Sequence, residues 1–146
     1  MASKFTPSPF SDALASDLGT AWHDRLADAR VLRDGGRHAA SIAAGLYALE
    51  ILLKERICQL LKVTHLPSAF QIHDLEGLAT LAGLRSRLDD PAFKQSLEGK
   101  SWSEVIKCGQ KLNDYRYQPN AATTKQEADD FFFWLLDLRE GIIPWI

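Results

Sequence analysis

The sequence predicts an all-α protein, a bundle of about five helices that forms a single domain over residues 1–146. Three observations predict this fold class. Apolar residues recur in steps of three and four over long stretches, which is typical of helices that bury one face. Glycines, prolines and helix-capping residues separate those stretches. No stretch shows the alternation of apolar and polar residues that is typical of strands.

The first two helices are predicted to be long and antiparallel. The first extends from residue 11 to about 33 and ends at Gly35 and Gly36. Its apolar stripe consists of Leu14, Leu18, Trp22, Leu26, Ala29 and Leu32. The second extends from residue 37 to about 63 and is apolar on more than one side, so we expect it to be the central helix. The short Gly-Gly turn between them makes the two helices antiparallel neighbours.

Two shorter helices follow a loop around Pro67. Asp74 is a good N-cap for the first of them, which Gly83 would end. Asp90 and the proline after it are typical of a helix start, and Gly99 of a helix end, so residues 91–99 are predicted to form a single peripheral helix.

Two capping boxes predict the last two helices. Ser101 with Glu104 would open a helix that ends near Tyr115, ahead of a proline. Thr124 with Glu127 would open the last helix, which Gly141 would end. Its inward face is predicted to consist of Ala128, Phe131, Leu135 and Leu138. The apolar residues 142–146 are expected to pack back on the bundle, whereas residues 1–10 are expected to be a flexible N-terminus.

Composition excludes several classes of protein. With 46% hydrophobic residues, 25% charged residues and few prolines and glycines, the chain is neither disordered, collagen-like nor a disulfide scaffold. Cys58 and Cys108 are predicted to be small buried thiols without a disulfide. The N-terminal residues lack the apolar run of a signal peptide, and no stretch is long and apolar enough to span a membrane. We therefore expect a cytoplasmic protein without a membrane partner.

Motifs for metal and cofactor binding are missing. The four histidines have no ligand spacing among themselves or with cysteines and carboxylates, so we expect no metal. Neither a phosphate-binding loop, a dinucleotide fingerprint nor a nucleophile elbow occurs, so we expect no cofactor. A net charge of −2 provides no general attraction to nucleic acid, but residues 23–66 and 84–119 each carry a small basic excess. An RNA partner would therefore have to bind a local basic patch.

Glu50 and Lys54 are the first candidates for a functional site. They lie one turn apart in the most apolar helix, in the order that favours an intrahelical ion pair. They form either a simple pair at the bundle edge or a pair that faces a polar seam or a dimer partner, because apolar surroundings make an isolated charge costly.

A second group of candidates lies at the predicted end of the helix that Ser101 opens. In residues 113–119, Asn113, Arg116 and Tyr117 combine a planar cation for phosphate with a ring that can stack on a base. The alternative is a helix C-terminus, where a cation is favoured by the helix dipole. His73 and Asp74 either precede a capped helix or line the same cleft.

Several segments together resemble the HEPN family (higher eukaryotes and prokaryotes nucleotide-binding). They read YALEILLKERIC, HDLEGLATLAGL, DYRYQP and GIIPWI, in the order in which the family has its motifs, between about residues 39 and 146. The resemblance implies a small helical bundle, usually a homodimer, encoded in bacterial toxin–antitoxin or defence loci and often beside a minimal nucleotidyltransferase. Many members are metal-independent RNases.

The chain departs from the family at the catalytic motif. Family RNases carry an arginine followed after four to six residues by a histidine near the fourth helix, but LNDYRYQP contains no histidine. Arg33 and His38 have a matching spacing but straddle the turn between the first two helices, so catalysis is not assigned to them. The residues that match the family are His73, Asp74, Arg116, Tyr117, Glu50 and Lys54.

Three hypotheses follow. The first is a homodimer that binds RNA or a nucleotide at a dimer cleft, in which His73 and Arg116 cleave RNA and Lys54, Glu50, Asp74, Asn113 and Tyr117 bind it. The second is a non-catalytic helical interaction module or antitoxin-like partner subunit. The third takes the resemblance as one of fold alone, because helical bundles host many functions.

Overall fold

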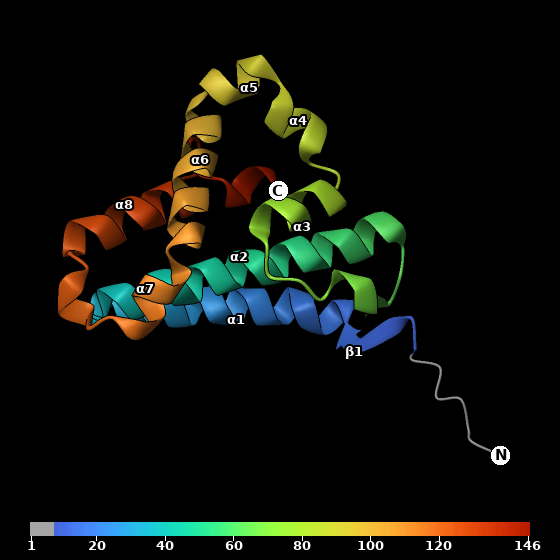
Figure 1. Ribbon diagram of the computed structural model, residues 1–146, viewed down its shortest axis with the longest axis horizontal. Helices are drawn as coiled ribbons and strands as arrows, with labels where there is room; N and C mark the ends of the chain where they lie inside the picture. The colour runs from blue at the N-terminus through green and yellow to red at the C-terminus, as the bar shows by residue number, and fades with distance from the viewer. Residues whose placement is uncertain (1–7) are drawn as a thin grey trace.

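The computed structural model describes residues 8–146, which form eight α-helices and a two-stranded sheet (Figure 1). The predicted all-α class is confirmed, and the sheet is a small addition to it. Most of the predicted flexible N-terminus lies outside the described residues. Within them, Phe10 already begins a strand.

Helices α1 (Ala15–Asp34) and α2 (His38–Leu61) form the antiparallel base of the molecule, as predicted (Figure 1). The turn between them depends on Gly36, whose φ of 76° lies in the left-handed region that favours glycine. Helix α1 starts later than expected because Phe10–Leu14 form strand β1, which pairs antiparallel with β2 (His65–Pro67).

The expectation that the chain has no strands is therefore wrong. The apolar spacing predicted that the first helix includes Leu14, but the loop after α2 offers hydrogen-bonding partners to residues of β1. Ala15 N donates to the Thr64 carbonyl at 2.8 Å and the Ser11 hydroxyl to the Leu66 carbonyl at 2.7 Å. Leu14 consequently leaves the predicted stripe and is 37% exposed.

Helix α2 is the central helix, as predicted, and packs against α1, α3, α7 and α8. The close approach of α8 depends on Gly45, where a Cβ would lie only 2.6 Å from Phe131 Cε1. Five apolar residues along one face of α2 are buried, namely Ile42, Leu46, Leu49, Leu53 and Ile57. Leu60, near the end of the helix, is exposed.

Three short helices follow α2 and a 3₁₀ turn, η1 (Ser68–Phe70). Helix α3 (Leu75–Leu81) has the predicted cap, because the Asp74 carboxylate accepts hydrogen bonds from two backbone amides of its first turn. Helices α4 (Arg85–Asp89) and α5 (Pro91–Gln95) come next, and the Asp90 cap of α5 is confirmed. The peripheral helix ends at Gln95, however, and not at Gly99.

Helix α6 (Leu97–Gln110) corrects the predicted start of the next helix. Its N-cap is Ser96, whose hydroxyl accepts from Gly99 N at 3.1 Å. Gly99 is needed inside the helix because a Cβ there would collide with the backbone of Phe93 in α5. Ser101 is buried in the first turns of α6 and opens no capping box. The helix breaks at Lys111, so the predicted stretch to Tyr115 is divided between α6 and α7 (Leu112–Tyr117).

After η2 (Asn120–Ala122), helix α8 (Lys125–Leu136) opens with the predicted capping box of Thr124 and Glu127. Its buried residues include the predicted Ala128, Phe131 and Leu135. The helix ends at Leu136, five residues before Gly141, and Leu138 is 88% exposed instead of inward-facing. The last residues pack back as expected through η3 (Ile143–Trp145), since Ile142 is fully buried.

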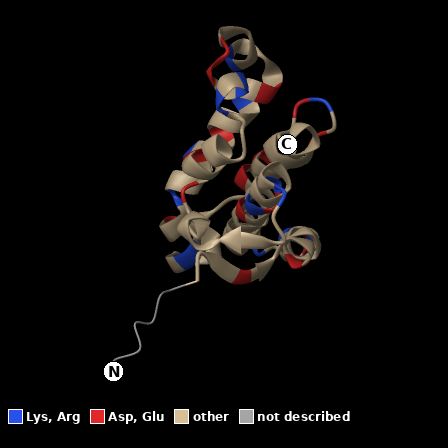
Figure 2. Ribbon diagram, turned by 90° about the vertical axis from the view of Figure 1, so that its right-hand side faces the viewer, with Lys and Arg blue, Asp and Glu red and all other residues tan. Residues whose placement is uncertain are grey.

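Other features bear on the predicted class of protein. Cys58 and Cys108 are free thiols, the first buried and the second half-buried. Within residues 8–146 no helix is long and apolar enough to cross a membrane. Figure 2 shows basic and acidic positions interspersed along the helices of the described residues.

Candidate functional site

The site is built on a buried ion pair in α2. Lys54 Nζ lies 2.7 Å from Glu50 Oε1, and the two side chains are only 11% and 8% exposed. Four-residue spacing places both on one face of the helix. Both side chains are therefore largely buried and do not form an ion pair on an exposed helix surface.

His73 completes the contact from a different element. Its Nδ1 lies 2.8 Å from the same Glu50 Oε1, although the His73 side chain is 82% exposed. The loop before α3 holds the ring there, and the Asp74 cap fixes where that loop ends. An ionised carboxylate only accepts hydrogen bonds, so Nδ1 donates and the neutral ring keeps Nε2 as an acceptor.

Arg116 lines the same hollow. A small hollow of about 30 Å³ is bordered by Glu50 from α2, His73 from the loop before α3, and Arg116 from α7. A larger hollow of about 220 Å³ adjoins it and shares His73, Leu75 and Gly109. We call the two hollows together the His73 groove. Gly109 lets α6 approach α3, since a Cβ there would lie 3.1 Å from Leu75 Cδ1.

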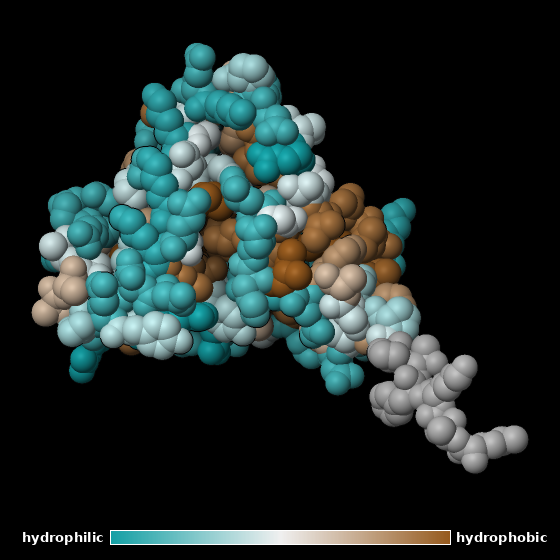
Figure 3. Space-filling view, in the orientation of Figure 1, coloured by the Kyte–Doolittle hydropathy of each residue, from teal (hydrophilic) through white to brown (hydrophobic). Residues whose placement is uncertain are grey.

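Apolar and hydrophilic surfaces meet over the elements that border the groove. Figure 3 shows apolar surface over α3 and the neighbouring part of α2, bordered by hydrophilic surface over α6 and α7. Arg116 is exposed, and its guanidinium forms no ion pair within residues 8–146. An unpaired cation beside an exposed imidazole can bind a phosphate group, because guanidinium presents several donors in one plane.

The structure brings together only some of the predicted site residues. Glu50, His73 and Arg116 share the small hollow, and Asp74 lines the larger one. Lys54 is buried against Glu50, so any effect it has on the site is exerted through that carboxylate. The remaining two, Asn113 and Tyr117, are exposed on α7 but line neither hollow.

Sequence reasoning missed Tyr47. This residue lines the small hollow and is 47% exposed. It lies three residues before Glu50 in α2, so helical spacing from Glu50 was the signal that could have found it.

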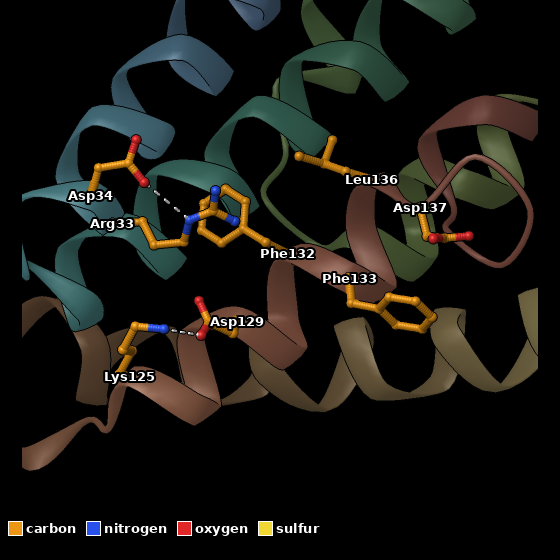
Figure 4. A pocket seen from close by; sticks show the side chains of 8 residues that line it. All are labelled: Arg33, Asp34, Lys125, Asp129, Phe132, Phe133, Leu136 and Asp137. Carbon is orange, nitrogen blue, oxygen red and sulfur yellow. Dashed lines mark hydrogen bonds and ion pairs between the residues drawn. The ribbon is translucent and has the colours of Figure 1, made fainter.

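A larger hollow lies elsewhere and contains no predicted site residue. It measures about 720 Å³ and lies between the end of α1 and α8 (Figure 4). Its cations are already engaged: Arg33 stacks 4.5 Å from the Phe132 ring centre and pairs with Asp34 at 3.6 Å, and Lys125 pairs with Asp129 at 2.6 Å. The Lys125 hydrogen bond lowers the pKa of Asp129.

Neither cysteine suits the role of a nucleophile. Burial raises the pKa of Cys58 and of Cys108, which keeps both thiols protonated near neutral pH. The described residues also contain no group of three or more His, Cys, Asp or Glu side chains that could hold a metal ion.

Comparison with known proteins identified no relative of the chain. No model of a protein family, no curated protein and no solved structure matches the chain. Function is therefore argued from the groove.

Proposed function

We propose that the chain is an HEPN-like bacterial protein that binds RNA at the His73 groove and cleaves it without a metal ion. A single observation carries this proposal: the exposed His73 is held by the buried Glu50 carboxylate, beside the unpaired Arg116. A carboxylate on Nδ1 orients the ring and stabilises the imidazolium that forms when Nε2 takes a proton.

In this reaction His73 is the base and Arg116 the electrophilic group. Nε2 of His73 removes the proton from a ribose 2′-hydroxyl, whose oxygen then bonds to the adjacent phosphorus. The bond from phosphorus to the 5′ oxygen breaks, and that oxygen leaves with a proton from solvent. Arg116 stabilises the charge that develops on the phosphoryl oxygens. The products are a 2′,3′-cyclic phosphate and a 5′-hydroxyl end.

The size of the groove favours a strand of RNA over a free nucleotide. Pockets that enclose small ligands typically measure about 300–1,000 Å³. The hollow beside Glu50 has only about 30 Å³, and the one adjoining it about 220 Å³. A phosphodiester that lies across the rim reaches His73 and Arg116 without entering either hollow.

The resemblance to the HEPN family adds the expected setting. It implies a homodimer in which the groove lies at a cleft between protomers, and a toxin–antitoxin or defence locus with a nucleotidyltransferase or other partner protein. Analytical ultracentrifugation tests the first of these expectations, and the neighbouring genes test the second.

A direct experiment tests cleavage. Purified protein is incubated with tRNA and mRNA in the presence of EDTA, and the ends of the fragments are analysed. Wild type is expected to release 2′,3′-cyclic phosphate ends, whereas His73→Gln and Arg116→Gln are expected to be inactive. His65→Gln and Arg56→Gln are matched controls outside the groove and should retain activity. Intact RNA with wild type at high concentration, together with no effect of Arg116→Gln in cells, would exclude the RNase.

The second candidate is a non-catalytic interaction module or antitoxin-like subunit. The buried Glu50–Lys54 pair favours it, because such a pair can be kept for structural reasons alone. This candidate requires His73 and Arg116 to bond to backbone or to each other, whereas His73 contacts a carboxylate and both side chains are exposed. Binding of RNA by wild type but not by His73→Gln would separate the two candidates.

A further inference from the structure

Among residues 8–146, Tyr47 is the one Phe, Tyr or Trp side chain that lines the small hollow of the His73 groove. It is 47% exposed, whereas its neighbours in the chain, Leu46 and Ala48, are 3% and 0% exposed. The ring therefore lies at the surface of an otherwise buried stretch of α2. Its position three residues before Glu50 places it on the same face of the helix as the carboxylate that holds His73.

The small hollow cannot enclose a nucleobase. Its volume of about 30 Å³ is far below the roughly 300–1,000 Å³ that is typical of pockets that enclose a small ligand. A base attached to a phosphate that Arg116 holds therefore stays outside the small hollow, and over its rim it reaches Tyr47. Tyr47 lines the hollow and is 47% exposed, and aromatic side chains bind bases by stacking without regard to sequence.

We propose that Tyr47 is a stacking subsite for one nucleobase and that it makes the His73 groove selective for single-stranded RNA. Bases in an A-form duplex stack on each other and are not free to stack on a side chain. This inference rests on the proposed RNA binding. It adds to that function a binding residue other than His73 and Arg116, and it names the class of substrate as single-stranded RNA.

The ring face, and not the hydroxyl, is the group that binds in this proposal. Tyr47→Phe keeps the ring and removes the hydroxyl, whereas Tyr47→Leu keeps an apolar side chain and removes the aromatic face. Phe133→Leu is the matched control, because Phe133 is a similarly exposed aromatic residue, 44%, in the hollow between α1 and α8.

The test measures affinity for a short fluorescent 2′-O-methyl RNA, which lacks the 2′-hydroxyl and cannot be cleaved. It is used as a single strand and annealed to its complement, and circular dichroism checks that each variant folds. We expect Tyr47→Leu to weaken single-strand binding by about tenfold or more. Tyr47→Phe and Phe133→Leu should bind as wild type does, and wild type should prefer the single strand.

Three results would overturn the inference. Single-strand binding by Tyr47→Leu that equals wild type would remove the subsite and leave RNA binding itself standing. Equal weakening by Tyr47→Phe would assign the effect to the hydroxyl. Absence of binding by wild type to either form of the RNA would overturn the proposed function together with the subsite.

Discussion

Substitution of Glu50 or Lys54 tests whether the two charges form a buried ion pair, because the free energy of unfolding should then depend on both partners. In Glu50→Leu the carboxylate is lost, and Lys54 Nζ, in a side chain only 11% exposed, loses its partner at 2.7 Å. Removing one member of a buried ion pair costs about 3–5 kcal/mol because the other charge stays buried. We expect the low end of that range, because a lysine side chain can bend toward solvent.

The partner variants should behave differently. Lys54→Met should cost less than Glu50→Leu, since Glu50 Oε1 keeps its contact with His73 Nδ1 at 2.8 Å. Glu50→Leu combined with Lys54→Met replaces both charges by apolar side chains of similar volume. Such replacements are often neutral, so the double variant should regain most of the stability that Glu50→Leu loses.

Thermal and urea unfolding measure these differences. A loss of about 3 kcal/mol corresponds to a decrease in Tm of roughly 10 °C for a chain of this size. The double variant should unfold close to wild type. Its His73 lacks the carboxylate, so RNA cleavage should fall as in His73→Gln even though the fold is intact.

Two outcomes would refute the reasoning. The first is a loss below about 1 kcal/mol for Glu50→Leu, which would be typical of an exposed pair. The second is a double variant whose destabilisation equals the sum of the two single losses, because additivity means that the charges do not interact.

Three further predictions concern the scaffold. Gly99→Ala should destabilise the protein by more than about 3 kcal/mol in urea unfolding, because its Cβ would overlap the Phe93 carbonyl; a loss under about 1 kcal/mol would contradict the packing of α5 on α6. Thr124→Ala should cost about 1 kcal/mol through the lost cap of α8 and Thr124→Ser much less, so equal losses in thermal unfolding would argue against the cap. Burial raises the pKa of Tyr115 above its ordinary 10.0 and that of Cys108 above 9.0. The unfolded state therefore loses these protons first, and Tm should fall as pH rises above about 9, less steeply in Tyr115→Phe; an unchanged slope in that variant would contradict the assignment.

Residue spacing predicted a helix or its cap correctly where the interactions that define it lie within the helix itself. The Thr124 capping box and the Asp74 cap involve groups only two or three positions apart, so the pattern predicted both hydrogen-bonded ends. The two long helices were predicted for the same reason. Their apolar periodicity extends over many turns and identifies α2 as the helix buried on several sides.

Residue spacing did not predict the structure correctly where a segment distant in the sequence determines it. Strand β1 forms because the loop after α2 supplies its hydrogen bonds, about fifty residues further along the chain. Gly99 is typical of a helix end, but it lies inside α6 because the backbone of α5 packs against it. The Ser101 box matched a sequence signature, yet that serine is buried within the helix that Ser96 caps.

The candidate site divides in the same way. The sequence by itself determined the Glu50–Lys54 pair, because a four-residue spacing on one helix brings the two charges together whatever surrounds that helix. It also marked His73 and Arg116 as polar groups at helix ends. Only the tertiary structure decided that both line one hollow with Glu50 and Tyr47, and that Asn113 and Tyr117 do not. The physical reason is that α2 packs against both α3 and α7, which brings these side chains close together. Such contacts join residues far apart in the sequence, so the spacing of residues along one helix does not predict them.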